Sequence, residues 1–322
     1  MKDKLLITFG CSWTFGVGLN YEPGMSSDLY KANAWNPTVA DKFSFRKYLV
    51  DRFDFEHLNF SSGGSSNCQQ LRRAKTFFTS NQFQKIQQQF KEIVVLWGIT
   101  STARKEIYDN ASDNIHVFFL SKDNPISKNL LLMLYNHEHE VFTLAKEMCF
   151  WNLFFKTLGV KNFWYDTFNH HDYTTNSPAI NLYKDKYLEL SGPDWPSWDD
   201  YLKKQWHCND LIAEEISSSS QIHQNADMKF TELINTSQIP NLMFDTDNPR
   251  DLMSGLAIDH GMINLDNVYH RSYWFGKSNK QDSNRVDFLI SKGLLNPISF
   301  HPTISAHKKI ADRMTDYLIK NL

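Results

Sequence analysis

The sequence predicts an α/β protein, a three-layer α/β/α sandwich built on a mostly parallel sheet. Short apolar runs of strand length alternate with stretches in which apolar residues recur every three or four positions, the spacing of an amphipathic helix. One run, residues 93–97, is apolar throughout, as a strand is when helices cover both faces of a parallel sheet. Strands that alternate with amphipathic helices favour a doubly wound sheet.

The first strand is expected at residues 5–9, followed by a helix around 45–53 and a second strand at 55–59. The serine- and glycine-rich run 61–66 marks a turn after the second strand. A glutamine-rich stretch with helical spacing then extends from about 67 to 90 and leads into the wholly apolar third strand. The first third of the chain therefore supplies three strands with helices between them.

The clearest helix is expected at 137–158, where apolar residues recur at three and four positions and Gly159 provides a stop. A fourth strand follows at 160–165. The last helix carries its apolar residues on one face within 310–318. These elements continue the alternation of strand and helix.

The alternation is lost in 170–290. This stretch contains three tryptophans close together, Trp195, Trp198 and Trp206, among prolines and acidic residues. Because the alternation resumes near its end, we interpret 170–290 as a large insertion within one domain that spans 1–322. We expect the insertion to cover the active-site edge of the sheet and to select the substrate.

Composition indicates an ordinary globular protein. Of the 322 residues, 41% are apolar and 22% are charged, and the formal net charge of −2 does not indicate a nucleic-acid partner. About five apolar residues precede the first glycine, too few for a signal peptide or a membrane span. The cysteines form no CxxC pair, which favours a reducing compartment. We expect a soluble, cytoplasmic protein without a membrane partner. The cysteines are Cys11, Cys68, Cys149 and Cys208.

Several unusual segments are expected at one edge of the sheet. They are Gly10-Cys11-Ser12, Ser62-Gly63-Gly64-Ser65, Gly98-Ile99-Thr100-Ser101 and 166–171, and each follows a predicted strand. Ligands of open α/β sheets bind at the carboxyl ends of the strands. The segment Phe300-His301-Pro302-Thr303, just before the last helix, is able to reach the same edge. A serine and a histidine that meet there suggest nucleophilic catalysis.

These segments resemble the conserved blocks of the SGNH (GDSL-like) hydrolase superfamily and occur in the same order. Residues 10–12 resemble its Gly-Asp-Ser block, 59–67 its glycine-containing second block, and 98–101 its Gly-x-Asn-Asp block. His301-Pro302 resembles the final block. The resemblance covers roughly the first 170 and last 40 residues and leaves out the insertion.

The resemblance implies roles for individual residues. Ser12 matches the nucleophile and His301 the general base. The backbone N–H groups of Ser12 and Gly64, with Gly63 in reserve for Gly64, match the oxyanion hole. Thr100 stands where the family has its oxyanion-hole asparagine, so its hydroxyl is expected to serve as a third donor.

Two further departures from the family pattern change the expected mechanism. Cys11 replaces the aspartate before the nucleophile, and Ile298 stands three residues before His301, where the family has its catalytic aspartate. We therefore expect a Ser12–His301 dyad in which a backbone carbonyl within 297–299 accepts the His301 Nδ1–H. The alternative is a triad completed by a distant acid: Asp166, Asp245, Asp247 or Asp287.

Substrate-binding residues are expected among Gly63, Asp166, Asn169 and His170. Asp166 and the two histidines at 170 and 171 are interpreted as a pocket rim rather than a metal site, because they lack a recognised ligand spacing. We predict neither a metal nor a cofactor. Arg104 and Glu106 are interpreted as an ion pair on a helix face, with binding of an acidic substrate as the alternative.

The function that follows is that of a serine esterase acting on a carboxylic ester, such as a small acyl ester or an O-acetylated or O-acylated carbohydrate. The alternative is a catalytically degenerate binding or structural protein that keeps the sandwich. Each site residue also has a structural interpretation. Ser12 is placed to begin or cap a helix, Gly63-Gly64 to form a tight turn, and His301 to support the fold.

Overall fold

The computed structural model describes most of the chain as two compact units. The first unit comprises Met1–Tyr135, Phe155–His171 and Asn241–Leu322, and the second Asn136–Phe154 and Asp172–Pro240. The second unit is described only at 137–154, so the fold and the site below belong to the first unit. The described residues of the chain are 3–109, 114–119, 137–167, 243, 251–262 and 280–322.

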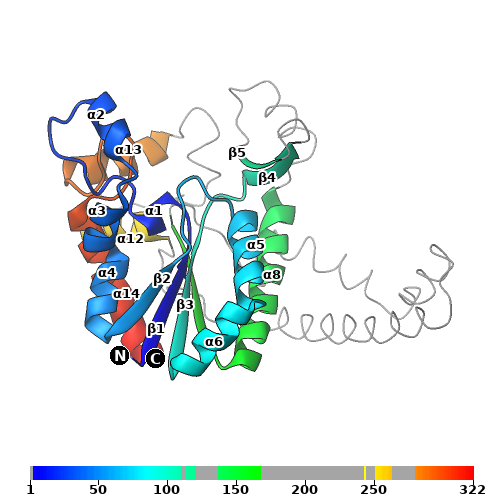
Figure 1. Cartoon of the computed structure of the whole chain (residues 1–322). Coiled ribbons are helices and arrows are strands. Elements are labelled where there is room, and N and C mark those ends of the chain that lie inside the picture. The colour runs from blue at the N-terminus through cyan, green and yellow to red at the C-terminus, as the bar shows by residue number, and fades with distance from the viewer. Residues whose placement is uncertain (1–2, 110–113, 120–136, 168–242, 244–250, 263–279) are drawn as a thin grey trace, which may run out of the picture. The chain divides into compact units, whose positions relative to one another are not determined.

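A parallel four-stranded sheet forms the centre of the first unit (Figure 1). Its order is β2-β1-β3-β6, and every neighbouring pair runs parallel. The strands are β1 (Lys4–Phe9), β2 (Phe55–Asn59), β3 (Glu92–Ile99) and β6 (Lys161–Asp166). The mostly parallel sheet predicted from the sequence is confirmed.

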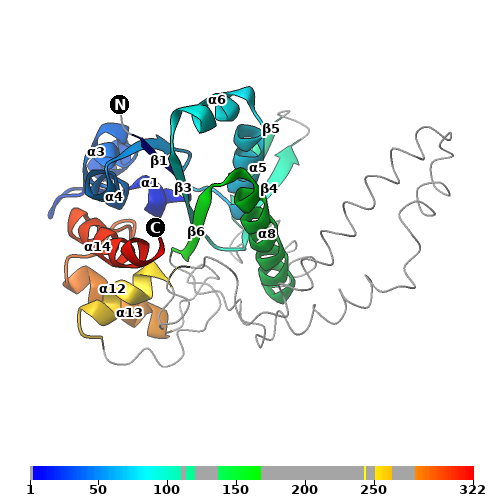
Figure 2. The ribbon, with the colours of Figure 1, turned by 90° about the horizontal axis from the view of Figure 1, so that it is seen from below.

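Helices cover both faces of this sheet (Figures 1 and 2). One layer holds α4 (Phe45–Phe53) and α14 (Ile304–Asn321), together with α12 (Leu252–Asp259) and α13 (Lys280–Ser291). The opposite layer holds α5 (Asn67–Phe78) and α6 (Asn81–Gln89). The predicted α/β sandwich is therefore present in the described residues.

The alternation of side chains along β1 explains the two layers, because successive residues of a strand point to opposite faces. Leu6 packs in the cluster that includes residues of α4, α12, α13 and α14. Phe9 points the other way and stacks on Trp97 of β3, with ring centroids 4.5 Å apart. Trp97 in turn stacks on Trp164 of β6 at 4.7 Å. These three rings occupy paired positions in the parallel register, so one aromatic row fixes three strands.

Several elements differ from the sequence-based prediction. The glutamine-rich stretch forms two helices, because the Ser80 side chain caps the second helix by accepting from the Phe83 N–H. The structure adds an antiparallel hairpin of β4 (Arg104–Asp109) and β5 (Asn114–Phe119). It also adds three short helices before α4: α1 (Ser12–Phe15), α2 (Ser27–Asn33) and α3 (Pro37–Phe43).

The helix predicted at 137–158 is α8 (His137–Leu158), which passes from the second unit into the first. It ends before Gly159, whose φ of 66° lies in the left-handed region that favours glycine. Of the proposed insertion 170–290, the structure describes α12, part of α13 and a few flanking residues. Trp195, Trp198 and Trp206 lie outside the described residues. No described helix is long and apolar enough to cross a membrane.

Candidate active site

The chain leaves β1 and β2 side by side, which brings two of the predicted site segments together. The Phe60 N–H donates to the Thr8 carbonyl at 2.8 Å, and the Ser62 N–H donates to the Gly10 carbonyl at 3.0 Å. The strand pairing is thereby continued beyond both strand ends. The Ser12 turn and the loop that carries Gly63 and Gly64 therefore begin as neighbours.

Ser12 is the first residue of α1, a helix of only four residues. Cys11 precedes it with an extended backbone, and Gly16 ends the helix at a φ of 95°. The N–H of the first helical residue has no acceptor within the helix. The Ser12 N–H is thus available to a ligand, while its side chain is nearly buried, with 5% of the residue exposed.

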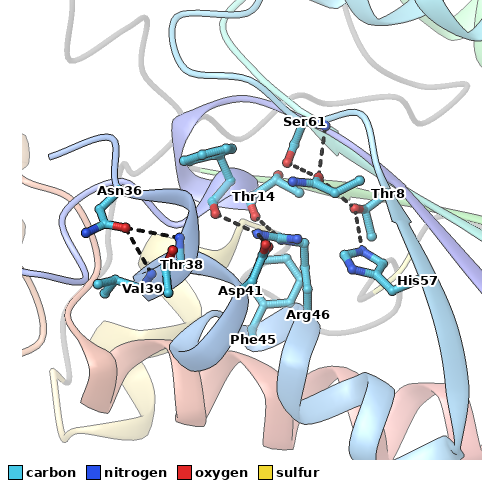
Figure 3. Close-up of polar contacts among 12 residues, drawn as sticks. Thr8, Thr14, Asn36, Thr38, Val39, Asp41, Phe45, Arg46, His57 and Ser61 are labelled. Carbon is cyan, nitrogen blue, oxygen red and sulfur yellow. Dashed lines mark hydrogen bonds and ion pairs between the residues drawn. The ribbon is translucent and has the colours of Figure 1, made fainter.

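A buried arginine anchors α1 from below (Figure 3). Arg46 of α4 donates from Nε to the Thr14 carbonyl and from Nη2 to the Phe15 carbonyl, both at 2.8 Å. Burial lowers the pKa of Arg46 to about 10, and the nearby carboxylate of Asp41 opposes this shift. The Thr14 hydroxyl also lies 2.8 Å from that of Tyr165. These contacts fix the helix that begins at Ser12.

The position of Cys11 does not suit a nucleophile. Its side chain is fully buried, and Sγ lies 3.9 Å from the Thr167 Oγ1. Thr167 itself donates from Oγ1 to the Ile99 carbonyl at 2.7 Å, just beyond the paired ends of β3 and β6. Cys11 thus fills the sheet edge between strands.

The loop after β2 is organised by Asn59. Its Oδ1 accepts from the Ser61 N–H at 3.0 Å, from the Ser61 hydroxyl, and from the Thr8 hydroxyl at 3.0 Å. The same threonine accepts from His57 (Figure 3). The loop then reaches Gly64, which is exposed and has a φ of 70°. A Cβ at Gly64 would meet nothing within 4 Å, so its backbone borders open space.

Gly63 lies directly against the ring of Trp35. A Cβ added at Gly63 would fall 1.4 Å from the Trp35 ring, so only glycine permits this approach. Trp35 is 52% exposed, and its ring centroid lies 6.1 Å from that of Phe15 in α1. An exposed aromatic surface therefore borders the turn of Ser12 and the glycine loop.

Thr100 is fully buried, and its Oγ1 has no hydrogen-bond partner among the described residues. Asn67 instead pairs with the Thr100 backbone, donating from Nδ2 to its carbonyl and accepting from its N–H, both at 2.9 Å. These two hydrogen bonds thus connect the segment after β3 to the start of α5. The Thr100 hydroxyl faces the interior in this structure, and its predicted role as an oxyanion donor requires it to turn outward.

His301 lies in a tight loop between α13 and α14. Its Nδ1 is 2.8 Å from the Ser299 hydroxyl, and no carboxylate contacts it in the described part of the chain. A Cβ added at Gly18 would fall 3.0 Å from the His301 Cβ, so the loop after α1 packs directly on this histidine. Within the described residues, no hydrogen bond joins Ser12 and His301. The two predicted catalytic residues therefore lie in neighbouring segments of the described structure without a hydrogen bond between them.

The electrostatic surroundings keep His301 neutral. Burial lowers its pKa to about 4, a backbone hydrogen bond with Ser299 raises it, and the positive charge of Arg104 lowers it. Arg104 begins β4 and donates from Nη1 to the Ser65 carbonyl at 3.3 Å. It does not lie on a helix, and Glu106 pairs with Arg72 at 2.7 Å, so the expected Arg104–Glu106 helix-face pair was wrong.

The remaining predicted residues fall in different places. Asp166 ends β6 at the same sheet edge but is 1% exposed. Its backbone pairs with that of Asp251 in a single parallel β-bridge. Arg285 lies 3.8 Å from Asp251 and balances its charge. Asn169 and His170 lie outside the described residues. Among the described side chains, no group of three or more His, Cys, Asp or Glu is arranged to hold a metal ion.

Four side chains of this region carry no motif and were not predicted: Tyr30, Trp35, Arg46 and Ser299, the last having been considered only for its backbone carbonyl. For Arg46 a signal does exist in the sequence. It follows Phe45 and precedes Leu49 by three positions, so it lies on the apolar face of an amphipathic helix. A charged residue at such a position is expected to have buried partners. No pattern in the sequence singles out the other three side chains.

No protein-family model matches the sequence, and no curated protein matches it. Among solved structures, the chain is similar to one from Parabacteroides merdae that is described as a "putative GDSL-like lipase". The sequence identity is 14%, and the match covers 72% of this chain and 97% of the other. The TM-score of 0.23 is too low to establish a shared fold.

Proposed function

We propose that the chain is a serine hydrolase of the esterase type, in which Ser12 attacks a carboxylic ester and His301 serves as general base. The observation that supports this proposal is the meeting of three segments. The Ser12 turn pairs with the glycine loop through Ser62 and Gly10, and the loop after α1 packs on His301. Nucleophile, oxyanion donors and base are recruited from such neighbouring segments in acyl-transfer enzymes.

The proposed reaction begins when the Ser12 Oγ attacks the carbonyl carbon and its proton passes to the His301 Nε2. The electron pair of the carbonyl moves to the oxygen. When the intermediate collapses, the bond to the alkoxide breaks and the alkoxide takes the proton from Nε2. A water molecule then repeats these steps on the acyl-enzyme, releasing the carboxylic acid and restoring Ser12.

Two backbone groups are suited to bind the oxyanion. The Ser12 N–H stands at the start of α1, where helix N-termini favour negative charge. The Gly64 N–H lies on the neighbouring loop and has no acceptor among the described residues. Loss of one such donor lowers turnover by about 10²–10³-fold in hydrolases that depend on it.

Because no hydrogen bond joins Ser12 and His301 in the described structure, the mechanism requires the two side chains to approach each other when substrate binds. Catalytic hydrogen bonds are commonly long in unliganded enzymes and shorten with substrate. Because burial keeps the pKa of His301 well below 7, its imidazole is neutral and able to accept a proton at neutral pH. We propose that substrate binding brings the Ser12 hydroxyl within reach of Nε2.

For the substrate, we propose a small acyl ester or an O-acetylated or O-acylated carbohydrate. The support is the exposed ring of Trp35 beside Gly63, with Phe15 nearby. Ligand pockets combine aromatic walls of this kind with a few polar groups that fix orientation.

The test is the Ser12→Ala variant in an assay of p-nitrophenyl acetate hydrolysis. Removing the nucleophile is expected to lower kcat to the background rate, while thermal stability changes little because Ser12 makes no side-chain hydrogen bond in the described structure. Ser291→Ala is the matched control, since this exposed serine lies at the end of α13. Full turnover by Ser12→Ala would remove the proposed mechanism.

The second candidate is a binding protein that keeps the fold without catalysis. The missing Ser12–His301 hydrogen bond and the inward-facing Thr100 hydroxyl favour it. The same assay separates the candidates. A binding protein shows no esterase activity that depends on Ser12, whatever the ester supplied.

A further inference from the structure

The loop that carries His301 is built around one asparagine. The Asn296 N–H donates to the His301 carbonyl at 3.0 Å, and the Asn296 Nδ2 donates to the same carbonyl at 3.2 Å. The Phe300 N–H closes the loop by donating to the Asn296 carbonyl at 3.0 Å. Asn296 is fully buried, and Phe300 adopts a φ of 59°. The backbone of His301 is thus fixed by several contacts within six residues.

The Ser299 hydroxyl lies at the centre of a hydrogen-bond network beside His301. It contacts the His301 Nδ1 at 2.8 Å, the Asn296 Oδ1 at 3.1 Å and the Tyr30 hydroxyl at 2.5 Å. Tyr30 comes from α2, 269 residues away along the chain, and is 2% exposed. Two groups, Asn296 from the same loop and Tyr30 from α2, therefore hold this small side chain against the imidazole.

Counting donors assigns the direction of each bond. Asn296 Oδ1 is only an acceptor, and it also accepts from the Ser299 N–H at 2.8 Å, which identifies it as oxygen. The single hydroxyl proton of Ser299 goes to this oxygen. Ser299 Oγ then accepts from Tyr30 and from the His301 Nδ1–H. His301 is therefore the tautomer with its proton on Nδ1, which leaves the lone pair on Nε2.

We propose that Ser299, held by Tyr30 and Asn296, is the positioning residue that fixes the tautomer and orientation of His301. This inference rests on the proposed function and gives the serine hydroxyl the place that a carboxylate has in a Ser–His–Asp triad. It adds a side chain to the backbone hydrogen bond with Ser299 that raises the pKa of His301. Ile298, at the position of the family aspartate, instead packs with Val17, Tyr30 and Ala34.

A hydroxyl differs from a carboxylate in its effect on the imidazolium. It fixes the tautomer but offers only a dipole to a protonated histidine. Among the described residues, the charged or titratable groups that act on His301 are Arg104 from β4 and His307 from α14, and neither is an anion. Burial lowers the pKa of His307 to about 3, so it is neutral at pH 7. His301 is thus neutral and able to accept a proton over a wide pH range, but it is a weak base.

The experiment compares Ser299→Ala with Ser299→Thr, which keeps the hydroxyl. For p-nitrophenyl acetate, Ser299→Ala is expected to lower kcat by about tenfold with KM unchanged, the effect of one lost hydrogen bond. Ser299→Thr is expected to retain most of the wild-type kcat. Nitrogen NMR of the wild-type His301 ring is expected to find the proton on Nδ1, and a mixture of tautomers in Ser299→Ala. Tyr30→Phe, which removes one donor to Ser299, is expected to show a smaller change of the same kind.

Thr303→Ala is the matched control for stability. This residue lies in the same loop, donates to the Gly293 carbonyl and caps α14, but it does not contact the His301 ring. It is expected to lower thermal stability while leaving kcat and the tautomer unchanged.

Two results would overturn the positioning role: a wild-type proton on Nε2, or full kcat and an unchanged tautomer in Ser299→Ala. An activity-based label mapped to Ser299 would also overturn it, because Ser299 would then be the nucleophile. The NMR measurement does not depend on turnover. If the wild-type protein cleaves no ester, the proposed function fails while the tautomer still decides whether Ser299 orients His301.

Discussion

At the scale of single residues, Arg46 shows how a buried charge supports the helix that begins at Ser12. Its side chain is 1% exposed and donates to two carbonyls at the end of α1. A planar guanidinium binds two acceptors at once, which the ammonium of a lysine does not reproduce. Its remaining ion-pair partner, Asp41, lies 3.6 Å away and is largely exposed. The two carbonyl contacts therefore explain most of its structural value.

Arg46→Lys is expected to destabilise the protein by about 1–3 kcal/mol, because it leaves buried carbonyl oxygens without a donor. Urea unfolding monitored by circular dichroism measures this change. Arg52→Lys is the control, since Arg52 lies on the same helix but is exposed. Its effect is expected to stay within about 0.5 kcal/mol. Equal stabilities of the two variants would show that the carbonyl contacts contribute little.

The residue scale is also where sequence reasoning was least complete. The resemblance to a known hydrolase family directed attention to Ile298 as the missing acid. Ser299 was considered only as one of three backbone carbonyls, not for the hydroxyl that contacts the His301 Nδ1. The reason is geometric. A loop with one left-handed residue, Phe300, turns the side chains before His301 in directions that spacing along the sequence does not reveal.

At the scale of elements, the sequence predicted the four sheet strands, α4, α8 and α14 to within a few residues. Short apolar runs indicated the strands, and apolar residues that recur every three or four positions indicated the helices. The hairpin of β4 and β5 was missed because its residues alternate weakly between polar and apolar. The helix α1 was missed because four residues are too few to show a period. The insertion 170–290 stays a prediction, since most of it lies outside the described residues.

The contact between α5 and the end of β3 depends on Asn67, which pairs with both backbone groups of Thr100. Asn67→Ala leaves a buried N–H and a buried carbonyl without partners, so we expect a loss of about 2–3 kcal/mol of stability. Thermal unfolding measures this loss. Asn81→Ala is the control, because Asn81 has the same first position in the exposed start of α6. Similar losses of stability in both variants would show that the two Asn67–Thr100 hydrogen bonds contribute little.

At the scale of the whole molecule, three histidines in the described part of the chain couple the fold to pH. Burial lowers the pKa of His57 to about 3, of His301 to about 4 and of His307 to about 3. In the unfolded chain each titrates near pH 6.5. Below that pH the unfolded state binds protons that the folded state does not, so stability falls as the pH decreases.

We expect the free energy of unfolding to fall between pH 6.5 and pH 4.5, by up to about 4 kcal/mol per pH unit if all three groups contribute fully. Urea unfolding at pH 7, 6 and 5 measures the slope. His57→Gln is expected to reduce the slope by about one third, because one of the three protons no longer takes part. A stability that does not change between pH 7 and pH 5 would show that these histidines are not buried in neutral form.

The central claim is that Ser12 is the reactive nucleophile of a hydrolase. Labelling the full-length protein with a fluorophosphonate probe, followed by mass spectrometry of its peptides, tests this claim most directly. We predict one modified serine, Ser12, in the tryptic peptide 5–31, and no labelling of the Ser12→Ala variant. A protein that takes up no label, or a label on any other serine, would contradict the account.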